Sequence, residues 1–447
     1  MKYRLSKFTR TVNVESGDII IYNTYTGKQS YIFDTDIKEQ LHRICSYPQD
    51  ETDIDHRLIS NFCVPVDMDE NMFVYNKVKG FMDSSDSLSL ILFPTLDCNF
   101  NCSYCYENKE KGIMSNETFE NIYSSIVNHY EVTKYRFLKL EWFGGEPLLC
   151  YEKILNFTKR VNDFCDEKGI LFQHSITTNG YLLSPIRIKS LLDNKVITYQ
   201  ITIDGAAKTH DSYRHLKDGK ATWKTIIDNL VAMKEFNDNF AVLIRVNYNY
   251  EILDSIEEFL DIYKEKFGDD ERYELAFKPI GHWGGENDAA VEIVPFDYHS
   301  FVLDELLKMC KSRGLLSTAN FSFSCGSELC YANKKNCFVV YKNGYLGKCT
   351  LEEQPEEGSD FVIGNLNEGY FKIDNYKESK WLPNDLAFIN YLNSNGCFDC
   401  IAYPFCCGTT CPAHRVKHGM ENRAKCTPTK NNIDNIVSLN YEISKKG

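Results

Sequence analysis

Six short apolar runs alternate with helix-like segments between Ser87 and Pro279, and this alternation constrains the fold more than any other feature. Each run has the length of a buried strand, and the segments between them carry apolar residues at helical spacing. Strands that alternate with helices form a parallel sheet. Six units are fewer than the eight that close a barrel, so we expect an α/β fold with a partial (β/α)6 TIM barrel. The expected strands are 88–93, 137–143, 171–176, 199–203, 241–246 and 273–277.

The composition limits the classes of function. The chain has 447 residues, of which 43% are hydrophobic, and a net charge of −13. The length predicts about three domains, and the acidic balance argues against nucleic-acid binding and against a polybasic membrane patch. No apolar stretch approaches the roughly 20 residues that a membrane-spanning helix needs. The N-terminal residues lack the apolar core of a signal peptide, so we expect a cytoplasmic protein.

A CxxxCxxC run, formed by Cys98, Cys102 and Cys105, directly follows the first expected strand. In such folds the chemistry gathers at the carboxyl ends of the strands. Three thiolates on a [4Fe–4S] cluster leave one iron open for a small-molecule ligand. The alternative is a zinc loop, which usually pairs a CxxC with a second Cys/His pair.

Polar motifs follow the ends of the next expected strands. Residues 144–147 read Gly-Gly-Glu-Pro, in which the glycines allow close approach to a ligand and the carboxylate can receive an ammonium group. An ordinary Gly-Gly-Pro turn is the alternative. Residues 177–180 read Thr-Thr-Asn-Gly and offer hydroxyls and an amide to a ribose or a carboxylate. Asp204 ends the fourth strand, and Arg245 and Asn247 end the fifth, where a cation suits an anionic ligand.

Together these motifs resemble those of the radical SAM enzymes, including an aromatic residue, Tyr104, just before the third cysteine. The resemblance implies a [4Fe–4S] cluster on Cys98, Cys102 and Cys105 that cleaves S-adenosylmethionine (SAM) to a 5′-deoxyadenosyl radical. It further implies that the GGEP motif binds the methionyl amine. For His210, Asp211 and Arg214, a structural ion-paired cluster and direct contact with the cofactor both stay open. The implied SAM-binding residues are Tyr104, Gly144, Gly145, Glu146, Thr178, Asn179, Asp204 and Arg245.

Residues 1–85 precede the barrel block, which we place at 86–314. Residues 18–25 and 29–33 have the pattern of a hairpin. Helical patterns follow at 37–45 and 54–62, and a short strand is expected near 72–75. This order is compatible with a winged-helix-like module.

Residues 315–447 are rich in cysteine and poor in long periodic helices, so this domain needs metal to hold it together. The cysteine spacing resembles the SPASM extension of radical SAM enzymes, which carries two auxiliary [4Fe–4S] clusters with interleaved ligands. A sulfur-only zinc site is the alternative. The resemblance assigns Cys325, Cys330, Cys349 and Cys411 to the nearer cluster, and Cys397, Cys400, Cys406 and Cys426 to the farther one.

The tail departs from the SPASM spacing at one position, because residue 410 is a threonine. Either Cys406 or Cys407 can therefore be the ligand. Cys337 similarly competes with Cys325, and if neither binds, the nearer cluster has an open iron. The remaining cysteines lie in isolated apolar patterns and are expected to be core residues: Cys45, Cys63, Cys150, Cys165 and Cys310.

The resemblance implies action on a peptide or protein. The preferred interpretation is modification of a ribosomally made precursor peptide to form a thioether or carbon–carbon crosslink, in which an auxiliary cluster accepts the surplus electron. The implied partners are that peptide with its leader, which the N-terminal module adds as another strand, and an electron donor such as flavodoxin or ferredoxin. No nucleic-acid or membrane partner is expected.

Two other functions stay open. One is the oxidation of Cys or Ser to formylglycine, as in anaerobic sulfatase maturases, which resemble this chain. In those enzymes an aspartate follows the second SPASM cysteine and serves as base, whereas Thr350, Leu351 and Glu352 follow Cys349 here. The other is a non-enzyme, either an iron–sulfur electron carrier or a peptide-binding scaffold.

Overall fold

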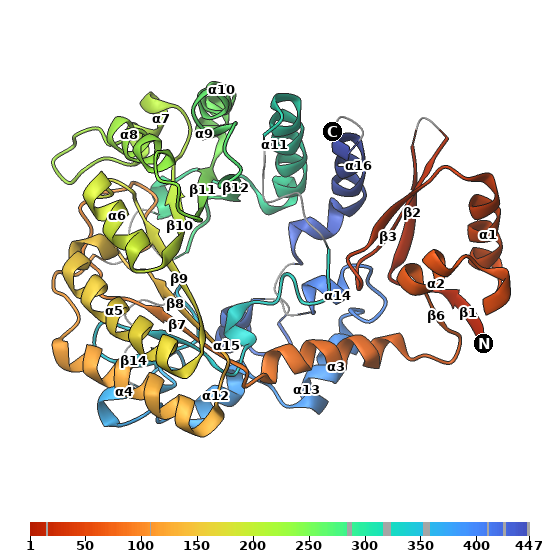
Figure 1. The fold of residues 1–447 in the computed structure, drawn as a ribbon, viewed down its shortest axis with the longest axis horizontal. Helices are drawn as coiled ribbons and strands as arrows, with labels where there is room; N and C mark the ends of the chain where they lie inside the picture. The colour runs from red at the N-terminus through yellow and green to blue at the C-terminus, as the bar shows by residue number, and fades with distance from the viewer. Residues whose placement is uncertain are drawn as a thin grey trace. The chain divides into compact units, whose positions relative to one another are not determined.

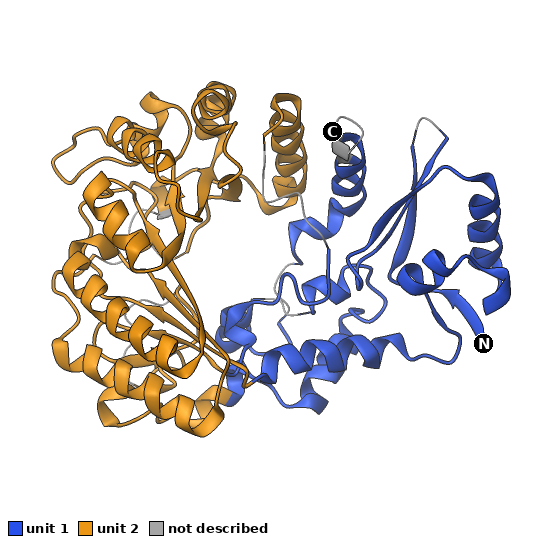
Figure 2. Ribbon diagram, viewed as in Figure 1, with its two compact units in different colours: residues 1–84, 319–335, 379–447 blue, residues 85–318, 336–378 orange. Residues whose placement is uncertain are grey.

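The computed structural model describes residues 1–14, 17–107, 109–283, 288–315, 323–351, 358–408, 411–422 and 426–444. The chain divides into two compact units (Figure 2). Unit 1 comprises residues 1–84, 319–335 and 379–447, and unit 2 comprises residues 85–318 and 336–378. Among the described residues, no helix is both long and apolar enough to cross a membrane.

Unit 2 contains the parallel sheet that the alternation predicted. Six strands pair side by side in the order in which they follow one another in the chain, and every pair is parallel. The apolar runs form strands because their side chains are buried, as at Leu90, Ile201 and Ile244. The strands are β7 (Ser87–Leu92), β8 (Phe137–Trp142), β9 (Leu171–Thr178), β10 (Val196–Thr202), β11 (Ala241–Tyr248) and β12 (Tyr273–Pro279).

Helices connect these strands, and α4, α5, α6 and α8 lie along one face of the sheet (Figure 1). The Ser115 hydroxyl accepts a hydrogen bond from the Thr118 N–H and starts α4. The buried stripe of α4 includes Phe119, Ile122 and Ile126, at helical spacing. The helices of unit 2 are α4 (Asn116–Thr133), α5 (Tyr151–Lys168), α6 (Pro185–Asp193), α7 (Ala207–Tyr213), α8 (Trp223–Lys234), α9 (Tyr250–Asp254), α10 (Ile256–Phe267) and α11 (His299–Arg313).

Three further strands extend the sheet beyond β7, and the sequence patterns had not indicated them. β13 (Cys337–Val340) pairs parallel with β7, while β14 (Tyr345–Gly347) and β15 (Gly364–Asn365) add antiparallel. Residues 336–378 thus belong to the same compact unit as the parallel strands.

Unit 1 contains two small antiparallel sheets. One is formed by β2 (Thr9–Asn13), β3 (Ile19–Asn23) and β4 (Gln29–Ile32), and the predicted hairpin between β3 and β4 is confirmed. The other is formed by β1 (Lys2–Leu5), β5 (Gln49–Asp50) and β6 (Cys63–Pro65). The two predicted helices are also confirmed, as α1 (Thr35–Ser46) and α2 (His56–Phe62). They pack on the first sheet through a core of Ile21, Ile32, Leu41, Ile44, Leu58 and Phe62.

The predicted strand near residues 72–75 is wrong, because this segment lies inside helix α3 (Glu70–Asp83). The Asp69 carboxylate accepts hydrogen bonds from the N–H groups of residues 71 and 72 and so starts the helix. Val74, Val78 and Met82 are buried at helical spacing. A run of a few apolar residues fits both periods, and here the N-cap decides for the helix.

The last part of the chain packs against the first sheet of unit 1. The Tyr22 hydroxyl donates to Asp434 Oδ1 at 2.6 Å, and Gln29 Nε2 donates to the Val437 carbonyl at 3.1 Å. The Thr24 hydroxyl donates to the Ile401 carbonyl at 2.6 Å. The remaining helices are α12 (Asn375–Trp381), α13 (Asp385–Ser394), α14 (Tyr403–Cys406), α15 (Pro412–His418) and α16 (Ile433–Ser444).

Candidate active site

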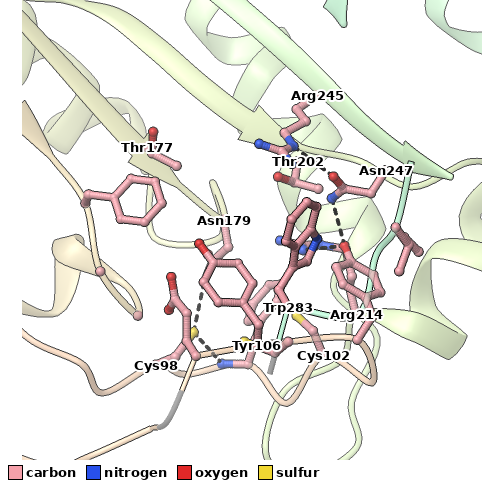
Figure 3. Close-up of a pocket in the computed structure, with 18 of the residues that line it drawn as sticks. Cys98, Cys102, Tyr106, Thr177, Asn179, Thr202, Arg214, Arg245, Asn247 and Trp283 are labelled. Carbon is pink, nitrogen blue, oxygen red and sulfur yellow. Dashed lines mark hydrogen bonds between the residues drawn. The ribbon is translucent and has the colours of Figure 1, made fainter. Parts of the chain in front are cut away.

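A cavity of about 170 Å³ lies in unit 2 at the carboxyl ends of the parallel strands. Its walls come from the loop after β7 and from the ends of β8 to β12 (Figure 3). Figure 3 shows Cys98 and Cys102 on one side of the cavity, with Arg245 and Asn247 on the other. Of the predicted site residues, those that line it are Cys98, Cys102, Tyr104, Cys105, Gly144, Gly145, Thr178, Asn179 and Arg245.

The loop that carries the three cysteines is held by a short pairing with residues 213–217. Phe100 and Leu216 form an antiparallel bridge. On either side of it, the Asn101 N–H donates to the residue 215 carbonyl at 2.8 Å, and the residue 217 N–H donates to the Asn99 carbonyl at 3.1 Å. The segment that follows α7 therefore fixes the backbone of the cysteine loop.

The three thiols lie in the wall of one cavity, where they could share a metal cluster. Cys98 and Cys102 are each 8% exposed, and Cys98 Sγ accepts a hydrogen bond from the Phe100 N–H at 3.4 Å. Burial raises the pKa of Cys98 to about 12 and also raises the pKa values of Cys102 and Cys105. Bound iron supplies the positive charge that deprotonates such thiols.

A single-ion site is not formed by the described part of the chain. Among those residues, no group of three His, Cys, Asp or Glu side chains is arranged to hold one metal ion. Thiolates on one zinc ion would lie about 3.8 Å apart, because each Zn–S bond is about 2.3 Å. A cluster spreads its ligands more widely, since each thiolate binds a different iron. The choice between a zinc ion and a cluster at these cysteines stays a prediction.

Tyr104 is tied to two strand ends through its hydroxyl group. The hydroxyl donates to Asp204 Oδ2 and accepts from Arg214 Nη1 at 2.9 Å and from Asn247 Nδ2 at 3.1 Å. Asp204 Oδ1 accepts from the Asn247 N–H at 2.8 Å. Asp204 is fully buried and does not line the cavity. Its contact with SAM stays a prediction, and in this structure it holds the Tyr104 ring against the cavity.

Glu146 is also fully buried and outside the cavity lining. Its carboxylate accepts from the Thr178 hydroxyl at 2.7 Å and from the N–H groups of Asn179 at 2.8 Å and Leu148 at 2.9 Å. Burial raises its pKa to about 6, against the effect of these hydrogen bonds. That this carboxylate receives the SAM amine stays a prediction. It joins β8 to β9 and so positions Thr178 and Asn179 in the cavity wall.

Gly144 and Gly145 are required by the cysteine loop itself. A Cβ atom on Gly144 would collide with the Thr95 carbonyl oxygen, and one on Gly145 with the Asp97 carbonyl oxygen. Gly144 also has a φ of +110°, which favours glycine. The Glu146 N–H donates to the Asp97 carbonyl at 2.9 Å. These glycines thus allow the backbone of the cysteine loop to come close, and they also line the cavity.

His210, Asp211 and Arg214 do not all lie at the cavity. His210 Nδ1 accepts from the Asp204 N–H at 3.1 Å, deep in the core. Asp211 Oδ1 accepts from the N–H groups of Thr222 at 2.8 Å and of residue 223 at 2.9 Å, and so caps α8. These two residues are structural, whereas Arg214 lines the cavity.

Several cavity residues were missed by the sequence analysis. Gln200 and Thr202 lie on β10, two residues apart, and polar side chains at that spacing in a buried strand are a usable signal. Trp283, in the loop after β12, had no local signal. Arg245 Nε donates to Asn247 Oδ1 at 2.8 Å, so these two predicted residues act as a pair.

A second cavity, of about 220 Å³, lies in unit 1 and is rich in cysteine. Cys407 does not line it. The Cys407 thiol lies 3.6 Å from the Pro404 carbonyl oxygen, and the residue has a φ of +60° where α14 ends, so its side chain turns away from that of Cys406. The cysteines that line the cavity are Cys397, Cys400, Cys406, Cys411 and Cys426.

The other tail cysteines are divided between the units. Cys325 and Cys330 belong to unit 1, whereas Cys337 and Cys349 belong to unit 2. Cys337 is buried in β13. The assignment of the nearer cluster, and the choice between Cys325 and Cys337, therefore stay predictions. Thr410 and Glu352, which the sequence analysis singled out, lie outside the described residues.

The expectation of core cysteines is confirmed for Cys150, Cys165 and Cys310, which are buried. Cys63 is half-buried and packs against the unit 1 core. For Cys45 the expectation is wrong, because this residue is exposed. Its neighbour Ile44 faces the core, and one step along a helix turns the next side chain by about 100°.

Comparisons with known proteins agree with this geometry. Residues 92–262 match the model of the radical SAM superfamily. The radical SAM cyclopropyl synthase TigE of Paramaledivibacter caminithermalis is 24% identical over 360 residues, which cover 72% of this chain and 67% of TigE. The cysteine-type anaerobic sulfatase-maturating enzyme of Clostridium novyi is 24% identical over 350 residues, which cover 72% of this chain and 87% of that enzyme.

Two solved structures share the fold. Native anSMEcpe with bound AdoMet superposes with a TM-score of 0.60 at 18% identity and covers 80% of this chain and 100% of that chain. Streptococcus suis SuiB bound to precursor peptide SuiA superposes with a TM-score of 0.52 at 15% identity and covers 95% of this chain and 99% of that chain.

Proposed function

Because the chain is a radical SAM enzyme, we propose that it modifies a ribosomally made precursor peptide by forming a thioether or carbon–carbon crosslink. The family implies one [4Fe–4S] cluster and SAM, which when bound supply a 5′-deoxyadenosyl radical. Cys98, Cys102 and Cys105 would hold the cluster. Thr178, Asn179, Arg245 and Asn247 would surround SAM, since they line the same cavity.

The observation that carries this proposal is the extent of the fold match. The SuiB structure, solved with a precursor peptide, covers 95% of this chain, whereas anSMEcpe covers 80% of it. We therefore propose that residues 1–85 form a winged-helix-like module that binds a leader peptide. TigE, which is related to this chain by sequence, is named as a cyclopropyl synthase, and a cyclopropyl group is a ring of carbon atoms.

The first sheet of unit 1 is suited to adding a peptide strand at an edge. One face of β2–β3–β4 packs on the core that contains Ile21 and Ile32. The other face meets α16, where the rings of Tyr31 and Tyr441 lie 4.7 Å apart. Both faces are thus covered, and within the described residues β2 and β4 each pair only with β3. An unpaired strand edge is where β-augmentation takes place.

Crosslinking also needs an electron acceptor. Closing the bond removes two hydrogens from the peptide. One would leave as a hydrogen atom that converts the 5′-deoxyadenosyl radical to 5′-deoxyadenosine, and the other as a proton and an electron. The cysteine cavity of unit 1 would hold an acceptor, with Cys397, Cys400, Cys406 and Cys426 as the ligands of the farther auxiliary cluster. We assign the nearer auxiliary cluster to Cys325, Cys330, Cys349 and Cys411, within a SPASM domain at 315–447.

The second candidate is oxidation of Cys or Ser to formylglycine. The Clostridium novyi relative favours it, because the alignment covers 87% of that enzyme. Against it, Thr350 stands directly after Cys349, where sulfatase maturases have an aspartate base.

The test is the mass of a precursor peptide after reaction. The enzyme is reconstituted with iron and sulfide without oxygen, reduced with dithionite, and incubated with SAM and the small peptide encoded beside its gene. We expect a loss of two hydrogens and no reaction of the product with a hydrazide. Formylglycine made from serine also loses two hydrogens, but its aldehyde forms a hydrazide adduct, and that adduct would contradict crosslinking. A peptide that lacks its leader is the control for recognition and should react poorly.

A further inference from the structure

Arg214 is a buried cation at the edge of the active-site cavity. The residue is 8% exposed and lines the same cavity as the three cysteines of the loop. Its Nη1 donates to the Tyr104 hydroxyl at 2.9 Å, and its guanidinium carbon lies 5.7 Å from the centre of the Phe100 ring. The buried Nε atom has no hydrogen-bond partner in the described structure. Arg214 is thus a buried cation in the wall of that cavity, in contact with the cysteine loop at Tyr104 and Phe100.

The counter-ion of Arg214 lies on the side away from the cavity. Asp204 Oδ2 is 3.9 Å from Arg214 Nε, and Asp204 is fully buried and does not line the cavity. Both members of this pair contact the cysteine loop through the Tyr104 hydroxyl, but only the positive member lines the cavity.

We propose that Arg214 raises the reduction potential of the cluster held by Cys98, Cys102 and Cys105, and that Asp204 opposes it. One-electron reduction adds a negative charge to the cluster. A buried cation stabilises that charge and a buried anion destabilises it, because neither is screened by water as a surface charge is. Cluster potentials depend on nearby charge and on hydrogen bonds to sulfur. The proposal rests on the cluster that the family implies, but it does not depend on the identity of the peptide product.

Other cations near the loop are less suited to this role. Lys217 is 48% exposed and pairs with Asp97 Oδ1 at 2.6 Å. Lys109 lines the cavity, but its Nζ makes a solvent-exposed hydrogen bond to Asn101 Oδ1 at 3.1 Å. Arg245 lies on β11, and its Nε donates to Asn247 Oδ1. In Figure 3, Arg245 stands across the cavity from Cys98 and Cys102. Arg214 therefore combines burial with a position beside the cysteine loop.

The experiment is a redox titration of the full-length holoenzyme, followed by electron paramagnetic resonance, with dithionite as reductant and without SAM or peptide. The signal that is absent from Cys102→Ala identifies the cluster in question. For Arg214→Met we expect at least a tenfold lower ratio of reduced to oxidised cluster at a given potential, which is a shift of about 59 mV to more negative potential for one electron. Arg214→Lys, which keeps the charge, should stay near the wild type.

Asp204→Asn should shift the potential in the opposite direction, because it removes the negative charge with little change in shape. Lys224→Met is the control for net charge, since this side chain is 83% exposed on α8, and it should cause no shift. Opposite shifts cannot both arise from a general loosening of the site.

The proposal is overturned if Arg214→Met and Asp204→Asn shift the potential in the same direction or not at all. It is equally overturned if Arg214→Met lowers SAM affinity without a shift, which would make Arg214 only a SAM ligand. If Arg214→Met takes up less iron, the potential of Asp204→Asn is the test: a shift to more positive potential supports the proposal, and no shift overturns it. Loss of iron in both variants would show that the pair merely holds the loop. Because no peptide is present, none of these results depends on the proposed crosslinking.

Discussion

At the scale of single residues, the buried cysteines of unit 2 fall into two kinds, those that line the active-site cavity and those that do not. Cys102 lines the active-site cavity, whereas the equally buried Cys150 lies outside it and contacts the Pro94 carbonyl oxygen at 3.7 Å. We expect Cys102→Ala to lose one cluster and to abolish SAM cleavage. Cys150→Ala should keep both and lose only about 1 kcal/mol of stability. Iron content and 5′-deoxyadenosine formation measure the difference, and equal losses in the two variants would contradict the distinction.

Neighbouring thiols at the end of α14 make a sharper pair. Cys406 lines the cysteine cavity of unit 1, while the Cys407 side chain turns toward the Pro404 and Phe405 carbonyl oxygens. We predict that Cys406→Ser lowers the iron content by the amount of one cluster, and that Cys407→Ser does not. Iron analysis after reconstitution checks this, with Mössbauer spectra to count clusters. A selective loss in Cys407→Ser would reverse the assignment.

His129 gives the barrel a predictable dependence on pH. Burial lowers its pKa from 6.5 to about 4, and its Nδ1 lies 2.9 Å from the Tyr370 hydroxyl. Between these two values the folded state binds fewer protons than the unfolded chain. The contribution of neutral His129 to the free energy of unfolding is therefore fully present above pH 6.5 and is lost as the pH falls toward 4. At pH 5 the expected loss is about 1 to 2 kcal/mol, after a discount for partial exposure.

Urea unfolding of the apo protein at pH 7.5 and at pH 5 measures this loss. His129→Phe should show a smaller difference between the two pH values than the wild type. The pKa of Glu146, raised to about 6, contributes in the opposite direction between pH 4.5 and pH 6. That contribution is common to both proteins and cancels in the comparison. Equal differences for the two proteins would contradict the role of His129.

At the scale of elements, two glycines test how the turn after β8 and the cysteine loop fit together. A Cβ atom on Gly145 would collide with the backbone of Leu96 and Asp97, whereas Gly80, in α3, has nothing within 4 Å of an added Cβ. We expect Gly145→Ala to cost about 1 to 3 kcal/mol and to lower cluster occupancy. Gly80→Ala should stabilise the protein by about 0.5 to 1 kcal/mol. Denaturant unfolding and iron content measure both variants. Equal changes in Gly145→Ala and Gly80→Ala would argue against the tight contact at Gly145.

The same scale explains where sequence analysis succeeded and failed. The six parallel strands were predicted well because each is a short, mostly apolar segment between helix-like segments. The segment at 72–75 was wrong because a few apolar residues fit both a strand and a helix. β13 and β14 were missed because strands of four and three residues carry too little periodicity.

For the active site, sequence position predicted which residues gather but not which way they point. Motifs at strand ends correctly predicted the neighbourhood of Thr178, Asn179 and Arg245, because parallel strands end at one edge of the sheet. The side chains of Glu146 and Asp204 turn into the protein and hold other residues instead. Their direction depends on partners that are distant in the sequence, so no local pattern could reveal it.

At the scale of the whole molecule, residues from both ends of the chain form one compact unit, and the barrel sheet forms the other. The proposed division of labour follows from this: unit 2 carries the radical chemistry, and unit 1 carries the leader-binding sheet and the cysteine cavity.

The measurement that tests the central claim most directly is deuterium transfer from the peptide. A precursor peptide labelled with deuterium at its carbon-bound positions is incubated with reduced enzyme and SAM, and the 5′-deoxyadenosine is analysed by mass spectrometry. The account predicts 5′-deoxyadenosine that carries one deuterium, together with a crosslinked peptide. Unlabelled 5′-deoxyadenosine beside an unchanged peptide would contradict it.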